Sequence, residues 1–330
     1  MTQEPEVTPE VTVVIPSHNR RRLMARTLHA VLAQRDVALE VLVVDDGSRD
    51  DTTAWLSAHP DPRVHAHRHP EPRGVSAARN TGLASARGRW VAFTDDDDLW
   101  APDKLRLQLD ALADDPGTRW SCVGAVNVDL GARPHLWHLP LESRDLGVTL
   151  LRINCVPGGG SGVLVDRALA VELGGFDEAI SNLADWDFYI RLGLAAPVAP
   201  VHRLLVGYLV DAGGMAHGIG RSEREYRYLD VKHERDRRAR GVELDRVNWL
   251  SYLGGLAYHS GQRATATRLH GTLAARHGQS RSVRTAVGSW LPLSVKRARQ
   301  AAWLTRSPLP EPCEWLEPYQ SGWLDDPRGD

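Results

Sequence analysis

The chain has 330 residues, a formal net charge of −2 and an ordinary composition, with 42% hydrophobic and 25% charged residues. A chain of this length forms one extended domain or two. The small negative charge argues against a general nucleic-acid binder, because no global attraction for a phosphate backbone exists. An anionic ligand would have to be held by a local group of residues.

The cysteines and the N-terminus favour the cytoplasm. The cysteines are odd in number and widely spaced, which excludes a disulfide framework and a metal knuckle and favours a reducing compartment. The first ten residues, MTQEPEVTPE, are acidic and contain proline, the reverse of a signal peptide. No apolar run reaches the roughly 18 residues of a membrane-spanning helix. The three cysteines are Cys122, Cys155 and Cys313.

The first half of the chain alternates between two kinds of pattern. Buried-strand patterns at 11–16, 40–48, 63–67 and 90–96 alternate with helical patterns at 21–34, 49–59, 74–88 and 101–112. Such alternation predicts an α/β domain with a mostly parallel sheet, whose ligands bind beyond the carboxyl ends of the strands. Polar clusters fall at these ends: 17–19, 45–46 and 95–98.

The character of the sequence changes twice further on. Residues 120–220 mix short strands with glycine-rich turns, and from Arg221 the chain is densely charged and helical up to about Ser307. The last stretch is rich in proline and tryptophan and is expected to be extended. We therefore expect a ligand-binding α/β domain over 1–220 and a helical C-terminal region over 221–330.

The segment WVAFTDDDDLW places four aspartates directly after a predicted strand. Because alternate side chains of a strand face the same way, Asp95 and Asp97 are expected to project together. Two carboxylates at this edge suit Mg²⁺ or Mn²⁺, whose shell a diphosphate and water would complete. The alternative is that the acids cap the following helix, which we favour for Asp98.

Five blocks, VTVVIPSHNR, VLVVDDGSRDDT, RGVSAARNTGLASARGRWVAFTDDDDLW, GGFDE and ADWDFYIRL, occur in an order that resembles family 2 glycosyltransferases with the GT-A fold. The resemblance runs from about Val11 to Gly214. It implies a Rossmann-like GT-A domain and an inverting, metal-assisted transfer of a sugar from a nucleotide-sugar donor, with a UDP-sugar as the expected donor. The expected acceptor is a saccharide, a lipid-linked sugar or a small molecule.

The resemblance also implies a nucleotide site. His18 stands where the family often has an aromatic side chain against the base, and a turn residue is the alternative. One carboxylate of the pair Asp45 and Asp46 would accept the imide N–H of a uracil. Arg79 resembles the family arginine near the base, although a helix-surface arginine is the alternative. The implied nucleotide-binding residues are Pro16, His18, Asn19, Asp45, Asp46, Arg79, Asp95 and Asp96.

The segment ADWDFYIRLG resembles the helix that carries the general base. The family pattern is Glu-Asp, whereas this chain has Ala184 before Asp185. One carboxylate suffices to accept the proton of an acceptor hydroxyl, so Asp185 is the expected base and Asp187 the next candidate. Asp187 and Arg191 are spaced to form an i,i+4 ion pair along the helix.

The implied metal ligands are Asp97, Asp95 and Asp211. The family often has a histidine in a segment comparable to GYLVDAGGMAHG, and Asp211 occupies its place in this register. Aspartate is an acceptable ligand for a hard cation. His217, six residues further on, is the alternative ligand.

Three other patterns leave their function open. The alternating His65, His67 and His69 form a potential metal face, but a solvated strand edge is the better expectation. The VPGGGSG segment lacks the ending of a P-loop and forms either a floor beneath the substrates or a plain turn. Residues 281–307 mix basic and apolar residues, which suits either an anionic membrane surface or packing within the protein.

Two further functions stay open. A sugar nucleotidyltransferase uses a related sheet but would need a glycine-rich loop bearing Arg or Lys after the first strand, which PSHNRRRL is not. A nucleotide-sugar-binding assembly subunit that has lost catalysis would explain Ala184 and Asp211.

Overall fold

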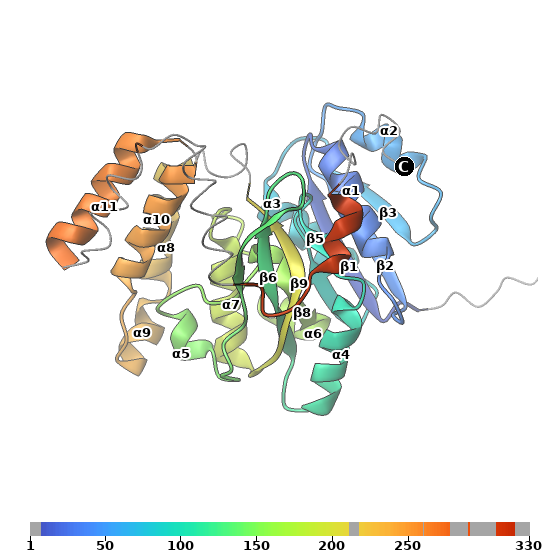
Figure 1. Ribbon diagram of the computed structural model, residues 1–330. Helices are drawn as coiled ribbons and strands as arrows, with labels where there is room; N and C mark the ends of the chain where they lie inside the picture. Colours follow the sequence, from blue (N-terminus) through green and yellow to red (C-terminus); the bar gives the residue numbers. More distant parts are fainter. Residues whose placement is uncertain (1–7, 211–217, 260, 278–289, 291–307, 321–330) are drawn as a thin grey trace, which may run out of the picture. The chain divides into compact units, whose positions relative to one another are not determined.

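The computed structural model describes residues 8–210, 218–259, 261–277, 290 and 308–320 (Figure 1). The chain forms two compact units. The first contains the described parts of Met1–Gly147, Cys155–Leu209 and Glu311–Asp330, and the second contains those of Val148–Asn154 and Val210–Pro310. The first unit is therefore discontinuous, because it includes residues from both ends of the sequence.

One nine-stranded sheet forms the centre of the first unit, in the order β3-β2-β1-β4-β8-β6-β9-β5, with β7 paired to β6. Strands β3, β2, β1 and β4 are mutually parallel, as predicted from the alternating patterns. The strands are β1 (Val11–Ser17), β2 (Leu39–Asp45), β3 (Val64–Arg68), β4 (Trp90–Phe93), β5 (Leu99–Trp100), β6 (Trp120–Val128), β7 (Pro134–His138), β8 (Val163–Asp166) and β9 (Val198–Leu209).

The second half of the sheet is mixed, which the parallel pattern did not predict. Strand β8 is antiparallel to both β4 and β6, and β6 is parallel to β9. Two reversals restore the original direction, so β6 and β9 run the same way as β1 and β4. The carboxyl ends of β1, β2, β4, β6 and β9 consequently meet at one edge of the sheet, where the polar clusters were expected.

Helices pack against the sheet in the first unit. Helix α3 packs against β1 and β2, and α4 packs against β6 and β9. The close approach of α3 depends on Gly82, because a Cβ there would lie 2.3 Å from Val14 Cγ1. The helices of this unit are α1 (Arg21–Leu32), α2 (Thr52–Ser57), α3 (Val75–Ser85), α4 (Lys104–Asp114), α6 (Arg167–Glu172), α7 (Ala184–Ala195) and two 3₁₀ turns, η1 (Gly159–Gly162) and η3 (Glu314–Tyr319); α5 (Gly147–Leu150) begins at its boundary.

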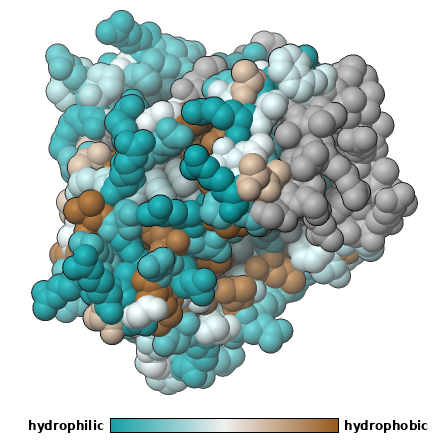
Figure 2. All heavy atoms as spheres, turned by 90° about the vertical axis from the view of Figure 1, so that its left-hand side faces the viewer, coloured by the Kyte–Doolittle hydropathy of each residue, from teal (hydrophilic) through white to brown (hydrophobic). Residues whose placement is uncertain are grey.

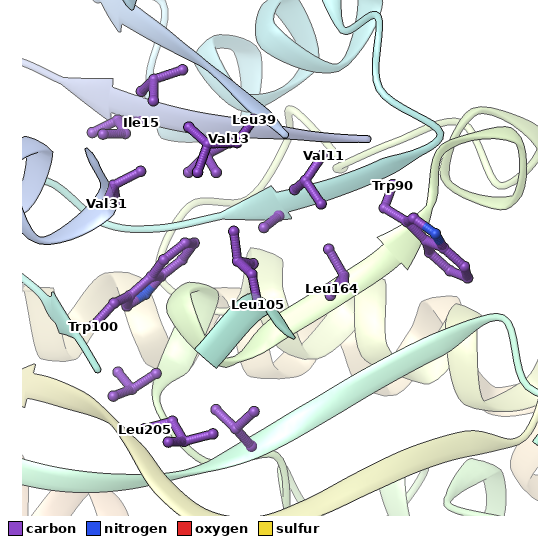
Figure 3. Close-up of a cluster of buried hydrophobic side chains, with 14 of the residues drawn as sticks. Val11, Val13, Ile15, Val31, Leu39, Trp90, Trp100, Leu105, Leu164 and Leu205 are labelled. Carbon is purple, nitrogen blue, oxygen red and sulfur yellow. The ribbon is translucent and has the colours of Figure 1, made fainter. Parts of the chain in front are cut away.

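A buried apolar cluster joins the strands to the helices (Figure 3). Val13 and Ile15 of β1 lie in it with Val31 of α1, and Trp100 and Leu105 belong to the same cluster. All five side chains are at most 1% exposed. Burial on this scale fixes the strands, and through them the loops at their carboxyl ends.

The C-terminal segment is not simply extended. Residues 308–320 include η3, and Leu316 is 1% exposed. Gly207 of β9 makes room for it, because a Cβ there would lie 3.1 Å from Leu316 Cδ2 and 3.4 Å from Trp315. The Tyr319 hydroxyl lies 3.2 Å from His29 Nδ1 of α1. This segment therefore completes the packing of the first unit.

The described part of the second unit is helical between residues 219 and 277. Helices α10 and α11 pack along each other, and the rings of Tyr226 and Trp249 stack at 4.3 Å between centroids. No helix in the described part of the chain is long and apolar enough to cross a membrane. One face of the molecule shows hydrophobic residues as separate areas on a mostly hydrophilic surface (Figure 2). The helices are α8 (Ile219–Lys232), α9 (Glu234–Arg240), α10 (Arg246–His259) and α11 (Arg263–His277).

Candidate functional site

The loop after β1 is tied to the loop after β2. Pro16 is buried in β1 beside Val44. The exposed His18 places Nδ1 2.7 Å from the backbone carbonyl oxygen of Asp46 and Nε2 2.7 Å from the side-chain nitrogen, Nδ2, of Asn19. The proton of His18 therefore lies on Nδ1. Asn19 adopts a left-handed conformation, at φ 55°, and its side-chain oxygen accepts a hydrogen bond from the Arg49 N–H at 2.7 Å. His18 and Asn19 are thus held at the edge where a ligand is expected.

Asp45 stabilises the turn that follows β2. Its carboxylate accepts hydrogen bonds from the Ser48 N–H at 2.8 Å, the Thr53 hydroxyl at 2.6 Å and the Arg68 guanidinium at 2.7 Å. Burial raises the pKa of Asp45, but the hydrogen bonds from Ser48 and Thr53 outweigh it, so the pKa lies below its usual range. Asp45 is an anion that protein groups already surround.

Asp46 is held by the loop that leads into α3. The backbone N–H groups of Arg73 and Gly74 donate to its two oxygens at 2.8 and 2.7 Å, and His69 Nδ1 lies 2.7 Å from Oδ1. These contacts lower the pKa of Asp46 against the opposing effect of burial. His69 is 5% exposed and its Nε2 lies 2.9 Å from the hydroxyl of Thr81. The expectation of a solvated edge is therefore wrong for His69.

The four aspartates do not continue a strand. Strand β4 ends at Phe93, and the Asp98 N–H bonds to the Asp95 carbonyl at 3.3 Å across a turn. Strand alternation therefore does not set the directions of Asp95 and Asp97, and that part of the prediction is wrong. The turn nevertheless leaves both carboxylates partly accessible, with side chains 18% and 17% exposed.

Arg20 bridges the middle of the turn. Its Nη1 donates to Asp96 Oδ1 at 2.9 Å and to Asp97 Oδ2 at 2.8 Å, and the Ser17 hydroxyl donates to Asp96 Oδ2 at 2.8 Å. Burial and the neighbouring Asp96 carboxylate raise the pKa of Asp97 to about 7. The single arginine does not offset the concentration of negative charge.

Arg79 reaches the same turn from α3. Its Nη2 donates to Asp95 Oδ1, and its guanidinium carbon lies 5.0 Å from the ring centroid of Phe176. The side chain is 5% exposed, and Nε has no hydrogen-bond partner among the described residues. A Cβ at Gly160 would lie 2.4 Å from Nη2. The glycine segment (156–162) thus leaves room for Arg79 to meet Asp95, and a floor beneath the substrates stays a prediction.

Asp98 has a structural function that differs from the expected helix cap. Its carboxylate accepts hydrogen bonds from the Ser161 hydroxyl and, at 2.9 Å, from the Leu209 N–H. Helix α4 begins after Asp103, with no side-chain cap. Burial and the neighbouring Asp97 raise the pKa of Asp98 well above its usual range. Asp98 therefore connects the turn formed by residues 95–98, the aspartate turn, to the glycine segment and to the end of β9.

Asp185 lies in the first turn of α7, partly exposed, and its Oδ1 accepts a hydrogen bond from the Trp186 N–H at 2.7 Å. Its charge acts on the pKa of Arg79, which places it near the aspartate turn. Asp187 is fully buried and accepts two hydrogen bonds from Arg191 at 2.9 and 2.7 Å, so the predicted ion pair is confirmed. That pairing makes Asp187 a poor proton acceptor.

The open donor atoms at this edge are of the kind that a hard divalent cation binds. Arg79 binds Oδ1 of Asp95, and Arg20 binds Oδ2 of Asp97. The other oxygen of each carboxylate, Asp95 Oδ2 and Asp97 Oδ1, accepts no hydrogen bond from the described residues. The carboxylates of Asp95, Asp96 and Asp97 share two guanidinium groups, those of Arg20 and Arg79, so acidic groups outnumber basic ones here. No three His, Cys, Asp or Glu side chains of the described ranges are grouped around one cation position. The expected third ligand, Asp211, and its alternative His217 lie outside the described residues.

Three residues hold the site through contacts that the sequence did not predict. Arg20 and His69 hold Asp97 and Asp46, and Ser161 binds Asp98 while its Oγ also lies 3.0 Å from the Asp95 nitrogen. Arg20 stood out only as one of three consecutive arginines, so no pattern marked it. Ser161 was detectable as the one hydroxyl within a glycine-rich run.

Residues 12–168 match the family described as glycosyl transferase family 2. This part of the chain is a glycosyl transferase family 2 domain. The matched residues run from β1 into α6 and include His18, the pair Asp45 and Asp46, Arg79 and the aspartate turn. Asp185 lies beyond them.

Several curated proteins are similar to this chain over part of their length. The succinoglycan biosynthesis protein ExoO of Rhizobium meliloti is 44% identical over 102 residues, which are 31% of this chain and 29% of that protein. The chondroitin synthase of Escherichia coli is 27% identical over 250 residues, 74% of this chain and 34% of that protein. The E. coli UDP-Glc:alpha-D-GlcNAc-diphosphoundecaprenol beta-1,3-glucosyltransferase WfgD is 35% identical over 99 residues, which are 30% of this chain and 39% of that protein. The chain thus spans about a third of the length of these relatives.

Solved structures confirm the expected GT-A fold for the family 2 domain. The mannosyltransferase PcManGT of Pyrobaculum calidifontis, in complex with GDP-Man and Mn²⁺, matches with a TM-score of 0.55 at 20% identity, over 98% of this chain and 87% of that one. S. aureus TarS 1–349 in complex with UDP matches with a TM-score of 0.52 at 17% identity, over 85% of this chain and 91% of that one. At this identity the likeness concerns the fold alone.

Proposed function

We propose that the protein is a metal-dependent inverting glycosyltransferase that moves a sugar from a UDP-sugar to an acceptor hydroxyl. The observation that carries the proposal is the aspartate turn, where two carboxylates keep one open oxygen each, at the ligand edge of a family 2 domain. Asp185 lies within electrostatic reach of this turn through Arg79. Metal, diphosphate and base would then share one edge of the sheet.

The donor site begins at the loops after β1 and β2. Pro16, His18 and Asn19 would line the nucleoside, with His18 held in a fixed tautomer. A carboxylate of Asp45 or Asp46 would accept the imide N–H of uracil; Asp46 Oδ2, which accepts one hydrogen bond, from Gly74, is the better candidate. The UDP complex of TarS and the UDP-Glc in the name of WfgD support uracil over the guanine of the PcManGT complex.

The cation would be Mg²⁺ or Mn²⁺, held by Asp95 and Asp97 with Asp211, or His217 in its place. Hard cations of this kind prefer oxygen ligands and bind phosphates readily. When bound, the cation would stabilise the negative charge of the departing diphosphate. Asp96 would stay on Arg20 and Ser17, at the edge of the donor site. The Mn²⁺ of the PcManGT complex supports the assignment.

Asp185 would act as the general base. The acceptor oxygen attacks the anomeric carbon while the bond to the diphosphate oxygen breaks, and Asp185 takes the proton of the attacking hydroxyl. Attack opposite the leaving group inverts the anomeric configuration. Asp185 is the more suitable carboxylate of α7, because Asp187 is buried against Arg191.

The acceptor class is taken from the relatives and from the second unit. The names of the relatives point to polysaccharide or lipid-linked acceptors. A small-molecule natural product is a further proposed acceptor. A cytoplasmic enzyme with a lipid-linked acceptor would benefit from contact with an anionic bilayer. The exposed residues of α8 include three arginines and one lysine, and such a face suits a surface of anionic lipid. Those exposed residues are Gly220, Arg221, Arg224, Arg227, Tyr228, Val231 and Lys232.

The two alternatives have less support. A sugar nucleotidyltransferase would need a glycine-rich loop after β1. In this chain residues 18–20 occupy that position and bind neighbouring loops through their side chains. A nucleotide-sugar-binding subunit without catalysis would bind a donor but never turn it over.

Two measurements test the proposal in sequence. A panel of nucleotide sugars is screened by thermal shift with and without Mn²⁺, and the expected result is stabilisation by one UDP-sugar only when Mn²⁺ is present. That donor is then incubated with saccharide and polyprenyl-diphosphate acceptors while UDP release is recorded. Binding without any release would favour the assembly subunit, and no metal-dependent binding would refute the proposal.

A further inference from the structure

Two arginines from different elements each hold one oxygen of a proposed metal ligand. Arg20, just before α1, donates to Asp97 Oδ2 at 2.8 Å, and Arg79 of α3 donates to Asp95 Oδ1. The other oxygen of each carboxylate accepts no hydrogen bond from the described residues. The arrangement is symmetrical, with one oxygen occupied and one open on each ligand.

Each arginine has a further contact that holds it beside its carboxylate. Arg79 is 5% exposed, lies against the Phe176 ring and has the backbone of Gly160 on another side. Arg20 is held by a second bond, from the same Nη1 to Asp96 Oδ1 at 2.9 Å. Turning either carboxylate to offer both oxygens to one cation would break a charge-assisted hydrogen bond.

We propose that Arg20 and Arg79 are positioning residues that restrict Asp97 and Asp95 to one oxygen each and so select a small octahedral cation against Ca²⁺. Mg²⁺ requires near-ideal octahedral geometry with short bonds, which single oxygens provide. Ca²⁺ takes more oxygens at longer distances and often binds a carboxylate through both. The inference rests on the proposed metal site and adds which residues set its selectivity.

The test compares the affinities of one protein for two divalent cations. The effect of a lost positive charge on both affinities then cancels. Removing a positive charge strengthens binding of every divalent cation, whereas releasing the second oxygen of Asp97 favours Ca²⁺ specifically. Mn²⁺ binding is measured by electron paramagnetic resonance with saturating UDP, and Ca²⁺ by competition. In Arg20→Gln the preference for Mn²⁺ over Ca²⁺ should fall by about tenfold, the scale on which partners of metal ligands act.

Two variants separate this effect from a change in charge or stability. Arg22→Gln removes a neighbouring exposed arginine of α1 and should leave the Mn²⁺ to Ca²⁺ preference unchanged. Arg20→Lys restores a donor near Asp97 and should return most of the preference. Arg79→Gln is measured as well if it folds, and the inference is decided by the Arg20 series if it does not.

The outcomes distinguish the inference from the proposed function. If neither the wild type nor any variant binds Mn²⁺ with UDP, the proposed metal site is wrong and the inference falls with it. If Mn²⁺ binds but the preference in Arg20→Gln equals that of the wild type, the metal site stands and the inference is overturned. A reduced preference in Arg22→Gln of the same size would also overturn it.

Discussion

Gly160 offers a test of the site that removes no charged group. A Cβ at this position would lie 2.4 Å from Arg79 Nη2, 3.1 Å from its guanidinium carbon and 3.4 Å from Asp95 Oδ1. Ordinary contacts begin near 3.4 Å, so the guanidinium of Gly160→Ala must withdraw by about 1 Å. The bond between Arg79 and Asp95 would then be lost or greatly weakened.

The expected magnitude follows from the burial of Arg79. Overpacking a well-filled site costs about 1–3 kcal/mol. For a unit of about 200 residues this lowers Tm by about 2–12 °C, since each kcal/mol corresponds to roughly 2–4 °C. Mn²⁺-dependent UDP affinity should fall by about tenfold or more, because Asp95 loses the partner that orients it.

Thermal unfolding and calorimetric titration of UDP with Mn²⁺ measure the two effects. The matched control is Gly271→Ala, where an added Cβ meets no atom within 4 Å and helix α11 gains up to about 1 kcal/mol. Wild-type UDP affinity in Gly160→Ala, together with an unchanged Tm, would refute the reasoning that the glycine exists to admit Arg79.

Four further results are expected. Asp97→Ala should abolish the Mn²⁺ dependence of UDP binding, and equal calorimetric affinity with and without this side chain would remove it from the metal site. Asp185→Asn should lower turnover by about 10²- to 10⁴-fold while donor affinity stays nearly constant, and near-normal turnover would place the base elsewhere. The pKa of Asp46 is lower in the folded protein than in the unfolded chain, so its ionised carboxylate stabilises the fold above the unfolded pKa, and this stability is lost as pH falls through the folded pKa. The Tm difference between wild type and Asp46→Asn should therefore shrink in acid. A Tm difference that does not change with pH contradicts this. Replacing Arg224 and Arg227 by Glu should abolish flotation with phosphatidylglycerol vesicles, and unchanged flotation excludes this face of α8.

The parallel half of the fold was predictable because its signals are local. Buried strands such as Val11–Ser17 are continuous apolar runs, and each is followed by a helical pattern. The reversal at β8 was not predictable, since its four residues read like any short apolar strand. Strand direction there depends on pairing with β4 and β6, which lie far away in the sequence.

The site was predictable in its residue types but not in its hydrogen bonds. The spacing of the aspartates and their position after β4 pointed to a cation site. The end of β4 at Phe93 depends on the turn that Arg20 and Ser161 stabilise, and neither residue is adjacent in sequence. Asp98 was misassigned for the same reason, because its partner Leu209 is 111 residues away.

The discontinuous first unit affects how the protein folds during synthesis. Residues 210–310 leave the ribosome before Leu316, which packs beside Gly207 in β9. At about 5–20 residues per second, the apolar surface reserved for Leu316 stays uncovered for several seconds after β9 has been made. A chaperone or a neighbouring nascent chain can contact that surface during this interval. Premature termination between residues 210 and 310 would therefore yield a sheet that is complete in its strands but prone to aggregation.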